Sequence, residues 1–220
     1  MKHYLKCALL GLAAGAAISL GGLLFVIAKT YFAAAGQPVG ALFFTVGLLL
    51  VCFFGFNLYT GKIGFLFNQE DKKNYIIDLA IMLVFNLIAS CCIGIIFHYA
   101  FMNVPEINTT ISSLMGKKVF EPSSNAYIGL LASSILCGAL VYIAVYTFKN
   151  TDKLWLKFIG IIVPIWIFVY SGFDHCIANG FYFGLGMVFG NYLMWINLLT
   201  CIVGNSLGAI ALNWLFKLKK

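Results

Sequence analysis

The sequence has very few charged residues and no arginine. Only 10% of its 220 residues are charged, whereas 62% are hydrophobic and the mean hydropathy is +0.98. Soluble domains average about 25% charged residues, so the composition excludes a soluble globular protein and indicates a polytopic membrane protein. A helical span takes about 20 residues, so roughly six spans with short loops use the chain and leave no stretch for a soluble domain.

Patterns typical of other protein classes are also missing. The apolar runs are continuous rather than alternating, which excludes a transmembrane β-barrel. The seven cysteines lie within or at the edge of apolar runs and form no CxxC pair, so neither a disulfide framework nor a zinc site is expected. No nucleotide-binding loop, metal-ligand spacing or nucleophile motif is present. We therefore expect a protein that is not an enzyme and that uses no cofactor or metal.

The apolar runs predict an all-α membrane protein with six transmembrane helices. The second and fifth spans are interrupted by polar residues and glycine, and short second halves are expected near 63–67 and 177–187. The polar segment 103–125 is the longest expected loop. The six expected spans are about 5–28, 39–56, 75–102, 126–148, 155–171 and 193–216.

The lysines predict the orientation in the membrane. If the N-terminus is inside, ten lysines fall on the inner face and three on the outer face, with Lys62 left within the membrane. Cytoplasmic loops are enriched in lysine, so both termini are expected in the cytoplasm. Topology then explains the net charge of +7, and no nucleic-acid partner is needed. The ten inner lysines are Lys2, Lys6, Lys72, Lys73, Lys149, Lys153, Lys157, Lys217, Lys219 and Lys220, and the three outer ones are Lys29, Lys117 and Lys118.

Short matches relate the two halves of the chain. Residues 11–14 resemble 129–132 at an offset of 118, residues 55–57 resemble 172–174 at 117, and residues 86–89 resemble 205–208 at 119. Three spans per repeat is an odd number, so the second copy is expected to be inverted. Paired interruptions in inverted repeats point to a transport site near the membrane midplane.

One stretch gathers polar residues inside the apolar run 159–189, namely Gly172-Phe173-Asp174-His175-Cys176-Ile177-Ala178-Asn179. An ionisable pair at membrane depth is energetically expensive and usually faces a cavity with a function. The flanking glycines predict a break in the helix, which is tolerated only where protein or water covers the backbone. The competing interpretation is that Asp174 and His175 only hold helices together.

These motifs resemble those of the formate/nitrite transporter family of pentameric anion channels over nearly the whole chain. The family's Gly-Phe-Glu-His-Ser-x-Ala-Asn motif corresponds to residues 172–179, and its Glu-Leu-Phe-Thr-Gly loop reads Asn57-Leu58-Tyr59-Thr60-Gly61 here. Its late Asn-Leu-Ile…Gly-Asn pattern reads Asn197-Leu198-Leu199…Gly204-Asn205. The resemblance implies an aquaporin-like, single-domain channel over 1–220, with repeats at about 1–102 and 126–220, that assembles as a homopentamer in the cytoplasmic membrane.

The resemblance also implies roles for individual residues. His175 and Thr60 are expected at the pore centre, and Lys118 is the nearest match to a lysine that draws anions into the outer vestibule, although its spacing to span four differs. Lys62 and Asn179 are further candidate pore residues. The expected constriction residues are Phe44 and Leu48 toward the cytoplasm and Phe168 toward the outside, and the expected structural residues are Asn57, Asp174, Asn86 and Asn205.

Two departures from the family pattern affect the expected substrate. Asn57 replaces the acid of the loop, and Lys62 stands where a neutral polar residue is common, so the centre is more positive. We expect a channel for small monovalent anions such as formate, nitrite or hydrosulfide, which pass after protonation at His175. A membrane-embedded enzyme using the Asp174–His175 pair, a channel for neutral solutes and a purely structural subunit are the alternatives.

Overall fold

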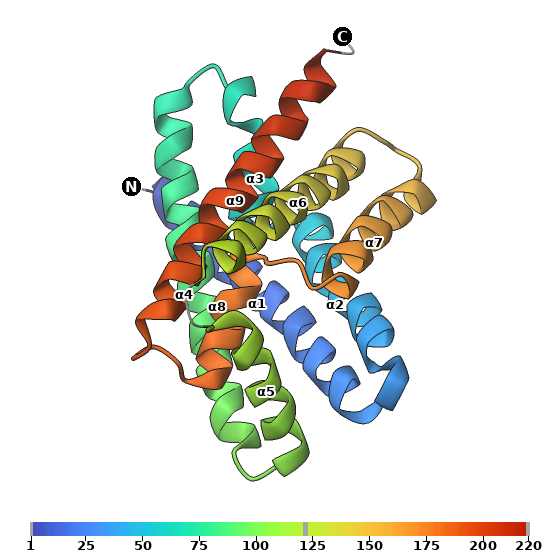
Figure 1. The fold of residues 1–220 in the computed structure, drawn as a ribbon. Helices are drawn as coiled ribbons and strands as arrows, with labels where there is room; N and C mark the ends of the chain where they lie inside the picture. Colours follow the sequence, from blue (N-terminus) through green and yellow to red (C-terminus); the bar gives the residue numbers. More distant parts are fainter. Residues whose placement is uncertain (1, 121–122, 219–220) are drawn as a thin grey trace.

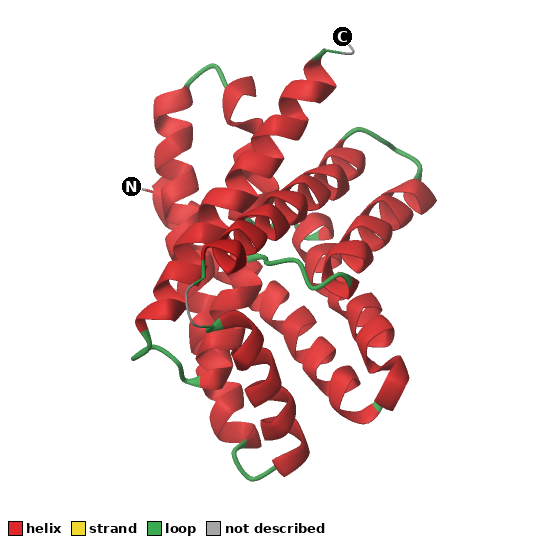
Figure 2. Cartoon of the chain, in the orientation of Figure 1, coloured by secondary structure: helices red, strands yellow, loops and turns green. Residues whose placement is uncertain are grey.

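The structure is a computed structural model that describes residues 2–120 and 123–218. All regular secondary structure of these residues is helical (Figure 2). The predicted cytoplasmic Lys219 and Lys220 lie outside the described residues. The elements are α1 Lys2–Tyr31, η1 Ala33–Ala35, α2 Gly36–Phe53, α3 Tyr59–Lys62, η2 Ile63–Asn68, α4 Lys72–Phe101, α5 Pro105–Lys118, α6 Ser124–Lys149, α7 Leu154–Tyr170, α8 Cys176–Gly186 and α9 Tyr192–Lys217.

Most of the long helices fit the predicted spans. Among the described residues, five helical segments are long and apolar enough to cross a membrane, and they correspond to α1, α2, α4, α6 and α9. The predicted fifth span corresponds to α7, which is apolar but shorter, and α8 continues it after a break. The chain connecting α7 to α8 runs through the middle of the molecule (Figure 1).

The two predicted interruptions have the same backbone geometry. Gly55 and Gly172 have φ values of +69° and +73°, and no atom lies within 4 Å of the position where a Cβ would be. The next residue donates its backbone N–H to a carbonyl five residues earlier, from Phe56 to Val51 and from Phe173 to Phe168. This is the Schellman ending of a helix, in which a left-handed residue lets the chain turn away. Glycine takes that conformation without the penalty that a Cβ imposes.

The second half of span two was predicted to begin near Ile63, and this is wrong. The helix resumes at Tyr59 as the four-residue α3 and continues as the 3₁₀ segment η2 to Asn68. In the fifth span, α8 begins at Cys176 and ends at Gly186, close to the prediction. The two second halves therefore differ in regularity, although they follow breaks of the same geometry.

Two buried asparagines tie the breaks to neighbouring helices in the same way. The Asn86 side chain accepts the N–H of Tyr59 at 2.8 Å and donates to the carbonyls of Gly11 and Asn57 at 2.8 and 2.9 Å. The Asn205 side chain accepts the N–H of Cys176 at 2.9 Å and donates to the carbonyls of Ser134 and Asp174 at 2.8 and 2.9 Å. Each side chain thus satisfies backbone groups that the broken helix leaves without partners.

This correspondence changes one of the offsets inferred from the sequence. The carbonyl of Gly11 accepts from Asn86, and the carbonyl of Ser134 accepts from Asn205 in the same way. By this correspondence α1 and α6 are related by an offset of 123 residues, whereas the sequence match gave 118. Gly15 and Gly138 fit the same offset, because each lies against the backbone of its asparagine with no room for a Cβ. Close backbone approach is a common reason for small residues in membrane helices.

The polar segment 103–125 was expected to be a loop, but most of it is helix α5. Pro105 occupies its first turn, where the missing N–H has no helical partner to lose. Ile107, Ile111 and Leu114 form a buried face of α5, which packs against α1 and α8. In Figure 1, α5 lies at the same end of the molecule as the α1–α2 connection, and its last residues are Lys117 and Lys118.

Candidate functional site

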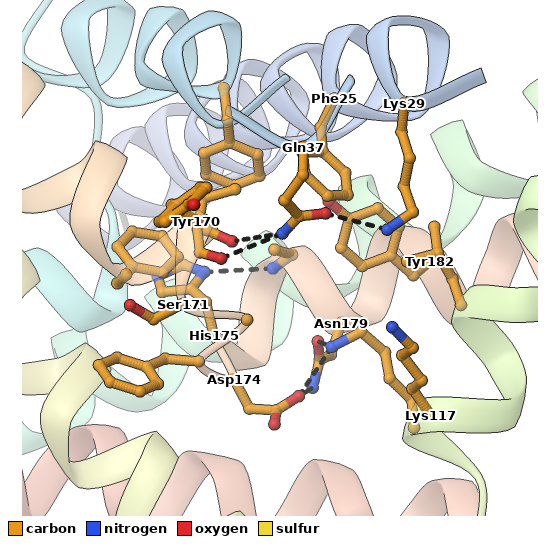
Figure 3. A pocket seen from close by; sticks show the side chains of 18 of the residues that line it. Phe25, Lys29, Gln37, Lys117, Tyr170, Ser171, Asp174, His175, Asn179 and Tyr182 are labelled. Carbon is orange, nitrogen blue, oxygen red and sulfur yellow. Dashed lines mark hydrogen bonds and ion pairs between the residues drawn. The ribbon is translucent and has the colours of Figure 1, made fainter. Parts of the chain in front are cut away.

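A cavity of about 680 Å³ lies among α1, α2, α5, α7 and α8 (Figure 3). Its charged lining residues are three lysines, from α1 and α5, and one carboxylate from the α7–α8 break. His175 and two of the residues predicted to form constrictions, Phe44 and Phe168, also line it. The residues that line the cavity include Lys29, Gln37, Phe44, Lys117, Lys118, Phe168, Asp174, His175 and Asn179.

Two hydrogen bonds fix the imidazole of His175, which is only 2% exposed. The backbone N–H of Ala178 donates to its Nδ1 at 3.2 Å, so His175 caps the N-terminus of α8. Because this N–H can only donate, Nδ1 must carry a lone pair, and the ring proton of the neutral histidine lies on Nε2. Nε2 is 2.8 Å from Thr60 Oγ1 and donates to it. The hydroxyl proton of Thr60 is then available to another acceptor.

Apolar side chains surround this polar pair. The rings of Phe44 and Phe168 meet edge to face with centroids 5.7 Å apart, and Phe168 stacks on His175 at 5.9 Å. A void of only about 10 Å³ lies between His175, Phe44, Phe168 and Leu48. This is about the volume of one water-sized probe, so the described conformation is closed beside His175.

Lys118 forms an ion pair at the floor of the cavity. Its Nζ lies 2.7 Å from Asp174 Oδ1 and 2.7 Å from Asn179 Oδ1, and Asn179 in turn donates to Asp174 Oδ1 at 3.0 Å. The two charged side chains are 13% and 15% exposed. Removing one charge of such a pair leaves the other uncompensated, which is strongly destabilising. The carboxylate of Asp174 thus balances the positive charge of Lys118.

After the first break, Lys62 and Asn57 make a contact that corresponds to the one between Asn179 and Asp174, but here the donor is charged and the acceptor is neutral. Lys62 Nζ donates to Asn57 Oδ1 at 2.6 Å, across the same five-residue spacing that separates Asn179 from Asp174. The acceptor here is a neutral amide, so the contact leaves the lysine charge unbalanced. Lys62 is not among the residues that line the large cavity.

Lys29, Gln37 and Lys117 are cavity residues that the sequence analysis did not select. Lys29 was placed only on the outer face, and Gln37 in the loop between spans one and two. The Gln37 amide donates to the carbonyls of Val169 and Tyr170 at 3.3 and 3.2 Å, and its Oε1 accepts Lys29 Nζ at 2.9 Å. No motif marks these residues, because they meet only when α1, α2 and α7 pack together.

Comparison with known proteins agrees with this geometry. A model of the formate/nitrite transporter family matches residues 1–218. The chain belongs to the formate/nitrite transporter family. This membership confirms the resemblance inferred from the motifs, and it places the chain among transporters rather than enzymes.

Curated relatives cover most of the chain. It is 28% identical to a probable formate transporter of Methanothermobacter thermautotrophicus, with 92% of this chain and 84% of the relative aligned. It is 30% identical to the uncharacterized transporter YrhG of Bacillus subtilis, with 90% and 79% aligned. The fold is similar to that of a pentameric formate channel with formate bound, with a TM-score of 0.81 and 22% identity over 99% of this chain and 96% of the other.

Proposed function

We propose that this family member is a channel of the cytoplasmic membrane for small monovalent anions of weak acids, with formate, nitrite and hydrosulfide as candidate substrates. The observation that carries the proposal is the buried hydrogen bond between Thr60 and His175, because His175 lines a cavity whose described residues have a net positive charge. The substrate class also rests on relatives that are described as formate transporters and channels.

Electrostatics favours passage of the neutral acid through the constriction. Moving a bare anion into an apolar environment has an idealised cost on the order of 20 kcal/mol, which water and protein dipoles reduce. Protonating a carboxylate with a pKa of about 3.9 at pH 7 costs only about 4 kcal/mol. The lysines and the N-terminus of α8 would concentrate the anion before this step.

In this proposal His175 supplies the proton, directly or through the Thr60 hydroxyl. The ring must first take a second proton at Nδ1, which breaks its hydrogen bond with the Ala178 N–H. The entering anion would offset the charge of the imidazolium, so proton uptake by the ring and entry of the anion are expected to occur together. The expectation that Phe44 closes the cytoplasmic side does not fit this geometry, because Phe44 meets Phe168 and lines the same cavity as the three outer lysines. In this proposal Phe44 and Phe168 would close the pore toward the outside and Leu48 toward the cytoplasm, while Asn179 and Lys118 line the approach.

The proposed architecture is one channel domain over 1–220, built from inverted repeats at about 1–102 and 126–220. The matching hydrogen bonds of Asn86 and Asn205 and the matching breaks at Gly55 and Gly172 support this arrangement. The lysine distribution supports cytoplasmic termini. In Figure 1 the C-terminal end of α9 and the α6–α7 loop lie at one end of the molecule, and the α1–α2 connection lies at the other.

We further propose a homopentamer, on the ground that the similar solved channel is described as pentameric. Native mass spectrometry of the detergent-solubilised protein should show five copies. A stable monomer or trimer would contradict this part of the proposal.

Flux into liposomes tests the function. Proteoliposomes should take up formate, nitrite and hydrosulfide faster than empty liposomes, and the ranking within one panel of anions identifies the preferred substrate. Lactate belongs in the same panel, because it is a larger weak-acid anion. Uptake of uncharged solutes alone would favour a neutral-solute channel, and no uptake of any kind would favour a structural role.

A further inference from the structure

The mouth of the cavity holds two positive charges that no described acid balances. Lys29, Lys117 and Lys118 line the cavity, and Asp174 is its only described carboxylate. Because Asp174 pairs with Lys118 at 2.7 Å, the charges of Lys29 and Lys117 remain. His175 adds no charge in its capped, neutral form. The described lining therefore has a net charge of +2, concentrated at its entrance.

The structure brings these two lysines to the same side of the cavity from separate helices. Figure 3 shows Lys29 extending from α1 and Lys117 from α5, with their amino groups directed toward the space between them. Both line the same cavity. A hydrogen bond of 2.9 Å between the hydroxyls of Thr30 and Thr110 connects the two helices next to Lys29, about two turns before Lys117 along α5.

Lys29 is also held in position without being neutralised. Its Nζ donates to the Gln37 carbonyl oxygen at 2.9 Å and lies 5.6 Å from the centroid of the Phe25 ring. Gln37 is fixed in turn by its bonds to the carbonyls of Val169 and Tyr170. An ammonium group has three donors, so Lys29 keeps two for a ligand. A fixed cation with spare donors loses little entropy on binding an anion.

We propose that Lys29 and Lys117 form a binding site for a doubly charged oxyanion, such as sulfate or a small dicarboxylate, at the cavity entrance. A dianion that contacts both ammonium groups balances both charges and removes their mutual repulsion, whereas a monovalent anion leaves one charge over. The ligand would stop at this point. The cost of moving an ion into the apolar constriction grows with the square of its charge, and a dianion must bind two protons to become neutral.

A dianion at this site would thus be a blocker and not a substrate. It would occupy the route to His175 and slow the entry of monovalent anions. This consequence rests on the proposed channel function, but binding at Lys29 and Lys117 does not. Binding and block are therefore measured separately.

Binding is tested with sulfate as the probe on the full-length protein in nanodiscs of phosphatidylcholine, a zwitterionic lipid with no net charge. Isothermal titration at constant ionic strength should show sulfate binding at least about tenfold more tightly than chloride. Lys29→Gln and Lys117→Gln should each weaken sulfate binding by at least about tenfold, the loss expected for one charged hydrogen bond. Lys153→Gln removes an exposed lysine near the start of α7 and should change binding by less than about twofold.

Three results would overturn the proposal: sulfate binding no tighter than chloride, equal effects of the Lys153 and Lys117 variants, or full binding in the Lys29→Gln, Lys117→Gln double variant. For block, sulfate added to proteoliposomes should slow formate uptake more than chloride at the same ionic strength, and the double variant should lose this difference. Tight sulfate binding without any formate uptake would contradict the channel function and leave the site in place.

Discussion

His175 is held in one tautomer because its two ring nitrogens have different partners. Nδ1 accepts from the Ala178 N–H and Nε2 donates to Thr60 Oγ1. Protonating the ring requires loss of the first bond, so the charged form of His175 also uncaps α8. Protonation of His175 and capping of the N-terminus of α8 are therefore coupled.

His175→Asn tests whether this ring makes transport depend on protons. Asparagine keeps a polar side chain that can cap a helix, so the variant should fold and assemble, but it cannot supply a proton near neutral pH. We expect the pH dependence of formate flux, measured from about pH 5 to 8, to differ from that of the wild type. Superimposable profiles of the two proteins would show that bulk water protonates the substrate and would remove His175 from the mechanism.

Lys62 carries a positive charge, whereas Asn179, which occupies the corresponding place in the second half of the chain, is neutral. It donates to Asn57 at the spacing at which Asn179 donates to Asp174, but it brings a positive charge and meets a neutral acceptor. We propose that this charge raises anion occupancy near the pore centre. The competing account is that the side chain only extends toward the cytoplasmic interface.

Lys62→Asn should slow anion entry or change the ranking of anions in the liposome panel. Lys153→Asn, which removes one lysine from an exposed loop position, is the matched control and should alter neither. An unchanged rate and ranking in the Lys62 variant would support the interfacial account.

At the scale of elements, the breaks after α2 and α7 depend on glycine for its backbone conformation and not for space. Gly172 has a φ of +73° with open space where a Cβ would be. A left-handed conformation costs other residues about 1–2 kcal/mol. The break also places Asp174 and His175, so strain there acts directly on the site.

Gly172→Ala should therefore destabilise the protein by about 1–2 kcal/mol through strain alone. Gly129→Ala is the control, because Gly129 lies in the helical α6 with no atom within 4 Å of a Cβ, and alanine there should be neutral or stabilising by about 0.5–1 kcal/mol. Thermal unfolding midpoints in one detergent check both. Equal shifts in the two variants would contradict a role for the left-handed backbone.

At the scale of the whole molecule, the proposed topology places Asn74 and Pro105 on opposite sides of the membrane, because Asn74 lies in the first turn of α4 and Pro105 follows its last residue. Both residues are exposed, so a cysteine at either position is accessible to a reagent. A membrane-impermeant thiol reagent applied to intact cells should label the Pro105 variant and not the Asn74 variant, with the wild type as background. Labelling of both from one side would contradict the topology.

The sequence by itself determined the class of the molecule and the places where its helices break. Few charges and long apolar runs leave a membrane protein as the compatible class, and this property depends on composition alone. Gly55 and Gly172 mark the breaks because a left-handed residue is a local requirement that glycine meets. The family motifs also identified His175 and Thr60, which the fold places 2.8 Å apart.

Only the tertiary structure decided how the charges are partnered. Lys118 and Asp174 are 56 residues apart, and Lys29 and Lys117 are farther apart, so their proximity follows from the packing of α5 and α8 against α1. The helix α5 was not predicted, because most of its residues are polar and such a segment is typical of a loop. Its few apolar residues form a buried face only when the helix packs against the rest of the protein. The offset of 123 between α1 and α6 likewise depends on which carbonyls reach Asn86 and Asn205. Contacts between distant residues depend on helix packing, which local hydropathy and spacing do not record.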